Sequence, residues 1–478
     1  MNRPLLHRFL RQRRLWTSFG LTLVIVLAWA GSSLAADPTG ASTIDIEGDP
    51  AGAAIAAANY TWVLIAAFLV FFMQAGFALL EAGSTRSRNS GSVFMKNLMD
   101  FCMCGLAFWA FGFAVMFGGS ELASGLGDGN ALIGFSGFFL TGEANDVGTM
   151  QLWIFQMVFA ATAATIVSGA MAERTKLGSY MAYSFLISAI IYPIFGHWMW
   201  GGGWLSTLPF GAGAKDFAGS SVVHAVGGIA ALVGALMVGP RKGKFINGRA
   251  QSLPGHNMGY VVIGTMILFF GWFGFNSGST FAATDLRISV IATNTFLAGI
   301  AGALVAYYIQ LSRTGRADVA VTCSGLIGGL VAITAPCAYV APWASVVIGG
   351  IAGALVIGVA AFLENKFKLD DPVWAVACHG GCGIFGMLAL GIFADGTYTD
   401  VNGMVGGDFE QIISQSIAVV AVIVWTGLAS AVVFGMLKAG MGLRVSEEDE
   451  DAGVDATEFV QPGLVFDAPR AEKLPAEL

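Results

Sequence analysis

The sequence predicts an all-α integral membrane protein with eleven transmembrane helices, arranged as an inverted five-helix repeat plus a final helix. Three observations predict this fold. The 478-residue chain is 56% hydrophobic and only 12% charged, which is too apolar for an ordinary soluble protein. It contains eleven apolar stretches, each near the roughly 20 residues that a helix needs to cross a bilayer. Two similar stretches, each with an aspartate eight positions before a histidine, stand five spans apart.

The first 36 residues are typical of a signal peptide. A basic region that contains Arg8 and Arg14 precedes an apolar run, and small residues around Ala35 offer cleavage sites. An uncleaved membrane anchor is the alternative. In either case, we expect residues 37–57 to form a periplasmic segment.

The spans that follow fall into two groups of five and one more. We expect them at residues 58–84, 93–118, 149–171, 178–196, 217–238, 257–278, 288–311, 318–336, 342–362, 372–394 and 410–437. The expected units are a first repeat (58–238), a cytoplasmic loop (239–256), a second repeat (257–394), a periplasmic loop (395–409), the eleventh helix (410–437) and a cytoplasmic tail (438–478).

Charge asymmetry sets the orientation of these spans. With residues 37–57 outside, the inner loops and ends carry fifteen lysines and arginines, whereas the outer loops carry only Lys215 and Arg287. An excess of basic residues on the cytoplasmic side is the usual pattern of membrane proteins. The sequence therefore predicts a cytoplasmic C-terminus.

The two Asp–His stretches fall in the fifth and tenth spans, which run in opposite directions. Asp216 and Asp371 are expected to cap their helices, with Pro372 at a first helical position. Eight residues of helix rise about 12 Å, close to half of a hydrocarbon core. His224 and His379 should therefore meet near the bilayer midplane, as in a transporter built from inverted repeats.

The middle of the expected spans holds no other carboxylate, lysine or arginine, so the sequence predicts an apolar pore with two neutral imidazoles. Moving a bare cation into such a medium costs on the order of 20 kcal/mol in the ideal Born limit. Removing a proton from an amine-like cation costs roughly 3–4 kcal/mol. This comparison favours a cation that is captured outside, deprotonated, and carried across as a small neutral base.

The outer ends of the spans offer aromatic side chains for such capture. A small cation gains cation–π attraction and a hydrogen bond from an aromatic cluster with a hydroxyl. An ordinary aromatic belt at the membrane interface is the alternative interpretation. The candidate residues are Phe155, Gln156, Phe159, Trp198, Trp200, Trp204, Phe275 and Ser279.

Other chemistry finds little support in the sequence. There is no P-loop, no GxSxG elbow and no HExxH motif, so we expect neither an enzyme nor a bound metal or cofactor. The basic loop Arg241–Lys244 is better explained by the usual excess of positive charge in cytoplasmic loops than by a nucleic-acid site. His197 and His256 stand at span ends and are expected to bond loops or the interface.

Several motifs together resemble the ammonium transporter family (Amt, Mep and the related Rh proteins), over residues from about 60 to 458. The motifs are Asp216-Phe217-Ala218-Gly219 through His224, Gly271-Trp272-Phe273-Gly274-Phe275-Asn276 through Ser279, Trp200-Gly201-Gly202-Gly203, Ala172-Glu173-Arg174, and Asp371 through His379-Gly380.

This resemblance implies an eleven-helix, trimeric protein with one pore per subunit. Phe159, Trp200 and Ser279 resemble the family's outer ammonium site, which Asp216 supports. Phe159 and Phe275 resemble its phenyl gate, and His224 and His379 its pore histidines. The tryptophan at position 200 favours the Amt branch of the family, because the outer site of the Rh branch lacks this indole.

The tail from Leu443 to Asp455 resembles the family's regulatory segment, which couples subunits and helps the cytosolic PII signal protein to block the pore. Two positions depart from the family pattern. Glu458-Phe459-Val460 stands where a His-Gly-Glu-like run is usual, and Phe466 stands where a tyrosine is common.

The sequence thus leads to one main hypothesis and two rivals. The main hypothesis is a transporter that binds NH4+ outside and conducts NH3 past two histidines, with or without separate proton transfer. The rivals are an ammonium sensor that signals through its cytoplasmic tail, and a channel for a neutral gas such as CO2.

Overall fold

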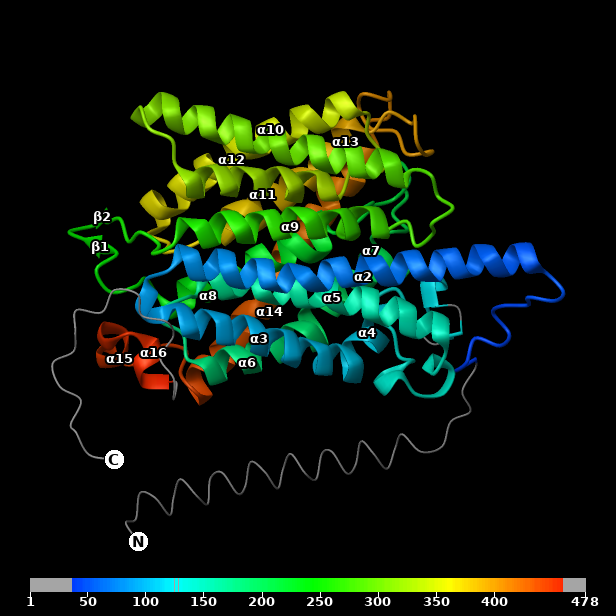
Figure 1. Cartoon of the computed structure of the whole chain (residues 1–478), viewed down its shortest axis with the longest axis horizontal. Helices are drawn as coiled ribbons and strands as arrows, with labels where there is room; N and C mark the ends of the chain where they lie inside the picture. The colour runs from blue at the N-terminus through cyan, green and yellow to red at the C-terminus, as the bar shows by residue number, and fades with distance from the viewer. Residues whose placement is uncertain (1–36, 124, 128, 459–478) are drawn as a thin grey trace, which may run out of the picture.

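The computed structural model describes residues 37–458 except 124 and 128. The expected signal peptide (1–36) and the end of the tail, with Phe459, Val460 and Phe466, lie outside the described residues. Almost all regular structure in the described part is helical, and long helices lie side by side in one bundle (Figure 1).

The first half of the bundle contains helices that are interrupted by π-helical turns. Its elements are α2 (Pro50–Ser84), η1 (Ser87–Asn89), α3 (Ser90–Ala107), η2 (Phe108–Gly112), α4 (Phe113–Phe117), η3 (Glu121–Ala123), η4 (Phe138–Leu140), η5 (Gly142–Ala144), α5 (Val147–Ala170), α6 (Leu177–Leu186), η6 (Ile187–Ile191), α7 (Tyr192–Trp200), η7 (Ser220–Ala225) and α8 (Val226–Val238).

A short hairpin and longer helices make up the second half. The elements are β1 (Phe245–Ile246), β2 (Arg249–Ala250), α9 (Met258–Gly278), α10 (Ile288–Thr314), α11 (Val319–Thr334), α12 (Pro342–Phe367), η8 (Val376–Gly381), α13 (Cys382–Phe393), α14 (Gln411–Gly440), α15 (Glu447–Ala452) and α16 (Val454–Glu458). The strands β1 and β2 pair antiparallel.

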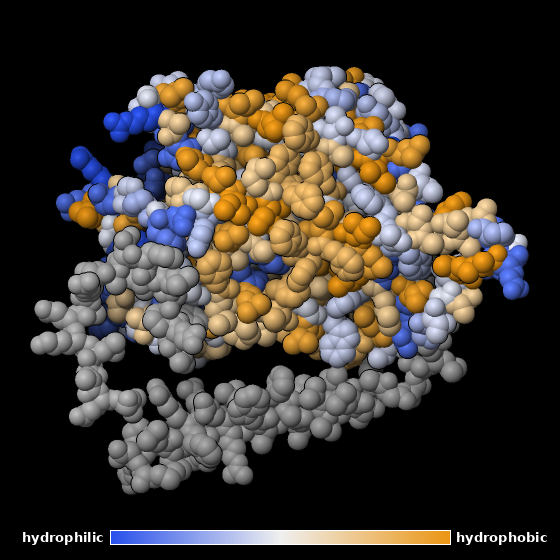
Figure 2. Space-filling view, in the orientation of Figure 1, coloured by the Kyte–Doolittle hydropathy of each residue, from blue (hydrophilic) through white to orange (hydrophobic). Residues whose placement is uncertain are grey.

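The predicted all-α membrane architecture is confirmed. Ten helical segments of the described chain are long and apolar enough to cross a membrane, and the shorter apolar helix α11 occupies the place of the predicted eighth span. Apolar side chains form a band across the middle of the molecule, and polar side chains gather at both ends (Figure 2). This distribution suits a bundle that presents its sides to lipid.

The two ends of the bundle differ. The β1–β2 hairpin, α15 and α16 lie at one end, which we call the tail end, and α2 begins at the other (Figure 1). Trp200 lies at the opposite end from the tail, because α7 ends there, whereas α6 begins beside the tail residues Gly442 and Leu443. We call this second end the tryptophan end.

The segments η7–α8 and η8–α13 run in opposite directions, as an inverted repeat requires. Arg241, just after α8, bonds to Asp370, just before η8. Conversely, Ser220 at the start of η7 lies against the backbone of Gly383 in α13. The start of each segment thus lies beside the later part of the other.

Helix α2 begins earlier than predicted. It starts at Pro50 instead of residue 58, so the predicted N-terminal segment 37–57 ends in helix. Asp49 caps this start, because its carboxylate accepts a hydrogen bond from the Gly52 N–H at 2.9 Å. A capping aspartate followed by proline favours a helix start at that position.

The structure buries three ionisable groups that the sequence does not single out. Glu81 in α2 and Lys96 and Asp100 in α3 are 2%, 3% and 0% exposed. Each has polar partners from neighbouring helices. For example, Tyr180 in α6 donates a hydrogen bond to Asp100 at 2.8 Å. Buried ionisable groups persist in membrane helices where they pair inside the bundle, and the sequence did not reveal that these faces meet.

Candidate functional site

The two histidines meet inside the bundle, and each is carried by a π-helical turn. His224 belongs to η7 and His379 to η8, and the two Nδ1 atoms lie 3.2 Å apart. One Nδ1 therefore donates to the other, which leaves both Nε2 atoms facing outward from the pair. The Nε2 of His224 is buried and has no hydrogen-bond partner among the described residues. π-Helical turns are frequent at functional sites.

Two glycines allow this meeting. A Cβ atom on Gly228 would lie 2.1 Å from the backbone nitrogen of Gly380 and 2.4 Å from its Cα. Backbone of α8 therefore touches backbone of η8, four residues after His224 and directly after His379. The inverted segments approach this closely only because neither residue carries a side chain.

Asp216 fixes the start of η7. Its carboxylate accepts backbone hydrogen bonds from Gly219, Ser220, Ser221 and Val222 at 2.7–3.1 Å, and one from the Ser221 hydroxyl at 2.6 Å. The predicted capping role is confirmed, although Asp216 caps from a loop three residues before the N-cap residue Gly219. The carboxylate also complements the positive end of the helix dipole.

Asp371 caps η8, but Pro372 is not at its first helical position. The Asp371 carboxylate accepts from the Val376 N–H at 2.8 Å. Between them the chain turns, and Trp374 adopts a left-handed conformation with φ of 57°. The helix begins only after this turn, so the expectation of eight helical residues before the histidine is wrong for both stretches.

Aromatic rings form a column between the histidine pair and the tryptophan end. The rings of Phe159 in α5 and Phe275 in α9 stack with centroids 4.0 Å apart. Phe275 in turn stacks on His224 at 5.4 Å. The two candidate gate residues therefore lie stacked together on the side of His224 that faces the tryptophan end.

Trp200 lies next to this column at the tryptophan end. Its ring is 6.3 Å from that of Phe159, and its Nε1–H donates to the backbone carbonyl of Asp216 at 2.7 Å. Ser279 caps the end of α9, one turn beyond Phe275, and its hydroxyl donates to the Phe275 carbonyl at 2.9 Å. Gly219 leaves room for the indole, because a Cβ there would lie 3.3 Å from it.

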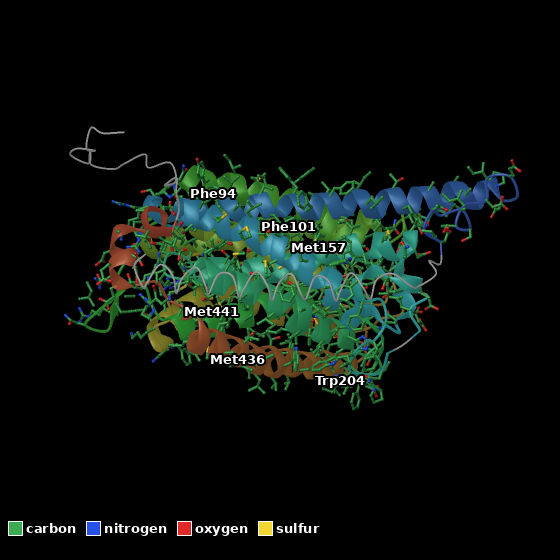
Figure 3. All side chains as sticks on the ribbon, turned by 90° about the horizontal axis from the view of Figure 1, so that it is seen from below. Phe94, Phe101, Met157, Trp204, Met436 and Met441 are labelled. Atoms are coloured by element: carbon green, nitrogen blue, oxygen red, sulfur yellow. The ribbon has the colours of Figure 1, made fainter. Side chains whose placement is uncertain are left out.

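The other two candidate tryptophans lie elsewhere. Trp198 and Trp204 contact each other at 5.7 Å, and Trp198 contacts Trp425 of α14 at 5.4 Å. They line an apolar groove beside α14, and Trp204 lies near the end of that helix (Figure 3). The aromatic belt is the better interpretation for this pair, whereas Trp200 belongs to the column.

The remaining candidate histidines bond loops, as predicted. The two ring nitrogens of His197 lie 2.8 Å from the Met116 carbonyl and 2.6 Å from the Asn130 carbonyl. His256 Nδ1 lies 2.9 Å from the Thr85 carbonyl. The structure places neither residue in the column.

Sequence reasoning missed two aromatic neighbours of the histidines. Trp272 stacks on His224 with centroids 5.1 Å apart, and its Nε1–H donates to the Thr334 hydroxyl at 2.9 Å. Phe77 lies 6.2 Å from His379. Trp272 stands three residues before Phe275, which on a helix places both on one face, and this spacing was the available signal.

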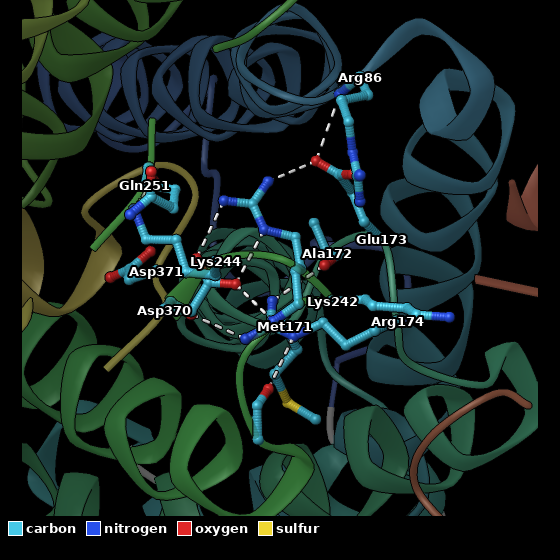
Figure 4. A network of polar contacts seen from close by, with 12 residues as sticks. Arg86, Met171, Ala172, Glu173, Arg174, Lys242, Lys244, Gln251, Asp370 and Asp371 are labelled. Carbon is cyan, nitrogen blue, oxygen red and sulfur yellow. Dashed lines mark hydrogen bonds and ion pairs between the residues drawn. The ribbon is translucent and has the colours of Figure 1, made fainter. Parts of the chain in front are cut away.

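A buried ion-pair network holds the loops at the tail end together (Figure 4). Glu173 pairs with Arg86 and with Arg241, and Arg241 also pairs with Asp370 at 2.9 Å. Burial opposes the charge on Asp370, but hydrogen bonds from Arg241 and the charge of Arg174 lower its pKa to about 2. The network joins four inter-helix loops at the tail end, including the loop that precedes η8.

Removal of the Glu173 carboxylate is expected to destabilise this end strongly. Glu173→Gln leaves Arg86 and Arg241 without their shared partner, and breaking a buried ion pair costs about 3–5 kcal/mol. Arg241 and Arg86 also hold the pKa of Glu173 below its ordinary value against the effect of burial. The stabilisation is therefore present above the ordinary value of 4.5 and is lost as the pH falls through the lowered pKa.

Thermal unfolding of the purified protein in detergent at neutral pH tests this expectation. Asp451→Asn is the matched control, because Asp451 pairs with Lys242 on the surface and exposed pairs contribute about 0–1 kcal/mol. An equal effect of both substitutions would show that the network is not a main source of stability.

Comparison with known proteins identifies the family. The model of the Ammonium Transporter Family matches residues 61–463. The chain is 49% identical over 452 residues to ammonium transporter Amt2 of Archaeoglobus fulgidus, with 92% of each chain covered. Among solved structures, a protein described as a sensor Amt protein matches with a TM-score of 0.77 and 38% identity, over 84% of this chain and 98% of that one. Mep2 of Candida albicans matches with a TM-score of 0.75 and 28% identity, over 88% and 92%.

These matches span nearly all of the described helices and include every residue of the aromatic and histidine column. The chain therefore belongs to the ammonium transporter family.

Proposed function

We propose that this protein transports ammonium: it binds NH4+ at the tryptophan end, removes a proton, and conducts NH3 past His224 and His379. The observation that supports this most strongly is the contact of the two imidazoles beneath a stacked pair of phenyl rings. The names of its relatives in the comparison support the same substrate.

The outer site supplies the right chemistry for NH4+. The indole of Trp200 and the ring of Phe159 offer π faces to a cation, and the Ser279 hydroxyl offers an oxygen. Asp216 keeps its carboxylate occupied with five hydrogen bonds, so its role is to hold the loop and to add negative potential near the site.

The column below it favours the neutral form. Phe159, Phe275 and Trp272 surround the path to His224 with apolar rings. A cation that lost its water here would face a cost of several kcal/mol, whereas NH3 can exchange hydrogen bonds with the Nε2 atom of His224.

We expect the double substitution His224→Ala and His379→Ala to change uptake or selectivity, because it replaces both polar groups of the column. Methylammonium uptake in a host that lacks its own ammonium transport measures this directly. Uptake and selectivity equal to the unmodified protein would exclude the histidines from the mechanism.

The membrane arrangement and partners form part of the same proposal. We place the tryptophan end in the periplasm and the tail end in the cytoplasm of a bacterial inner membrane, in line with the loop charges. We also propose a homotrimer, which membership of the ammonium transporter family supports. Light scattering of the detergent-solubilised protein would report the subunit number.

The tail end is where a cytosolic PII signal protein would bind. The α15–α16 segment contacts the core there: Asp455 accepts from the N–H groups of Gly91 and Ser92, and Glu450 accepts from the Lys242 N–H. A pull-down of the full-length chain with the PII protein of its host tests this partner.

A sensor that signals through its tail is the second candidate, because one structural relative is described as a sensor Amt protein. The same tail contacts would allow such signalling. Ammonium flux in reconstituted vesicles separates the two functions, since a pure sensor would bind ammonium with little flux.

A further inference from the structure

The charged cluster of Glu81, Lys96 and Asp100 has no part in the function proposed so far. Glu81 accepts hydrogen bonds from the Ser168 hydroxyl at 2.7 Å and from the Asn97 amide at 3.1 Å. Lys96 donates to the Ser168 carbonyl at 3.2 Å. The cluster thus lies where α2, α3 and α5 meet.

A small cavity connects this cluster to the histidine pair. Glu81 and His379 line the same cavity, together with Phe77, Ile166 and Cys378. Its volume of about 20 Å³ is sufficient for one molecule of the size of water or ammonia.

The cavity lies on the way to the tail end. Leu80, Ile327 and Val373 line it, and the same three residues line a wider pocket of about 380 Å³. That pocket also contains Asp318, Glu364 and Asp371, along with Arg241 and Lys244. The small cavity, with Glu81 and His379 on its wall, therefore adjoins a polar mouth.

Charge counting indicates that the cluster binds an exchangeable proton. Two carboxyl groups and one ammonium would carry an uncompensated negative charge if all were ionised. The negative charge of Asp371 also repels a negative charge on Glu81. Near Lys96, the positive charge of Arg174 is opposed by the negative charge of Glu173. An uncompensated buried charge is costly, so one additional proton makes the cluster neutral.

We propose that Glu81 is the proton-exchange residue of the inner half of the pore. This inference depends on the proposed conduction of NH3 past His379. The proton removed from NH4+ passes to the histidine pair, and His379 becomes an imidazolium. This imidazolium releases one proton through the molecule in the cavity to the Glu81 carboxylate, so that one N–H bond breaks, one carboxyl O–H bond forms, and His379 returns to neutral imidazole. Ammonia in the cavity then takes this proton: the O–H bond breaks, an N–H bond forms, and NH4+ leaves through the polar mouth.

The lysine completes this cycle electrostatically. After the second transfer Glu81 is a carboxylate, and Lys96 supplies the neighbouring positive charge. NH4+ then moves toward the acidic residues of the wider pocket. The net result is one NH3 and one proton that enter separately and leave together as NH4+.

Glu81→Gln tests the proposal, because the carboxamide has the same size and still accepts from Ser168 but carries no exchangeable acid proton. The full-length protein is reconstituted in vesicles, and uptake of ¹⁵N-ammonium is measured together with the accompanying current. We expect the charge moved per ammonium to fall by about tenfold or more while uptake remains, since acid–base groups commonly contribute at least that factor to a proton transfer.

Thr165→Val is the matched control. Thr165 donates a hydrogen bond to Asn97 at 2.8 Å, so its removal weakens the same buried network without removing an acid. Charge per ammonium should equal that of the unmodified protein. If Glu81→Gln does not fold because Lys96 loses the nearby negative charge, the double substitution Glu81→Gln and Lys96→Met removes both charges and provides the same test.

The outcomes distinguish the two proposals. An unaltered charge-to-uptake ratio in the Glu81 variant overturns the inference, and so does uptake without current in the unmodified protein. Both results leave NH3 conduction standing. Absence of uptake in the unmodified protein overturns the proposed function itself.

Discussion

Replacement of Gly228 by alanine is expected to abolish transport. The new methyl group would lie 2.1 Å from the backbone nitrogen of Gly380, and backbone atoms cannot move aside as a flexible side chain can. The two inverted segments must then separate, which breaks the 3.2 Å contact between His224 and His379. Overpacking of this kind costs about 1–3 kcal/mol of stability, but the loss of alignment in the pore should be the larger effect. Methylammonium uptake in a transport-deficient host measures it.

Gly435→Ala provides the control for this expectation. Gly435 also lies within a helix, α14, but a Cβ there would meet no atom of the described residues within 4 Å. Alanine at an open helical site is neutral or stabilises by about 1 kcal/mol. Wild-type uptake in the Gly228 variant would mean that the close approach of the two segments is not required.

Asp216→Asn is expected to destabilise the protein and to stop transport. The aspartate carboxylate satisfies five donors at the start of η7, whereas an asparagine side chain offers one oxygen and points an N–H₂ group at the others. Unsatisfied buried donors cost about 1–3 kcal/mol each, partly relieved by relaxation. Because η7 carries His224 and the Asp216 carbonyl holds Trp200, both the outer site and the histidine pair should shift.

Asp49→Asn makes a matched comparison, since Asp49 caps α2 through a single exposed hydrogen bond to Gly52. Its loss should cost no more than about 1 kcal/mol. Thermal unfolding and uptake are measured for both variants. If the two behave alike, Asp216 does not organise the site as the hydrogen bonds indicate.

The sequence predicted the helices well because their signal is strong. An apolar stretch of about 20 residues is seldom anything except a membrane-spanning helix, and α10 begins at Ile288 and α12 at Pro342, as expected. The pairing of His224 with His379 was also predictable, because charge asymmetry fixed the direction of each span and the two Asp–His spacings are equal.

The π-helical turns and the loop before η8 could not be predicted. A π turn inserts one residue into a helix without any change in the apolar pattern, so η7 and η8 look like ordinary helix in the sequence. Pro372 suits a helix start, but the left-handed turn at Trp374 delays it. That turn depends on tertiary contacts beneath η8, which local sequence does not contain.

The buried charges were missed for a similar reason. Lys96 stands near the end of its span and counts equally well as a loop cation, and Asp100 is isolated in the sequence. Only the packing of α3 against α5 and α6 brings Ser168 and Tyr180 to them. Among the aromatic residues, the physical argument alone could not separate Trp200 from Trp198, because both stand at the end of the same span. The family resemblance singled out Trp200, which the structure places beside Phe159, whereas Trp198 contacts Trp425.

The central claim is that ammonium crosses as ammonia through a column of aromatic and imidazole rings too apolar for a bare ion. Vesicles that contain the purified protein test it most directly when ammonium and potassium are added separately at equal concentration, with current and cation uptake recorded. The account predicts uptake of ammonium and neither current nor uptake for potassium. A potassium flux comparable to that of ammonium would contradict it, because potassium has no proton to lose.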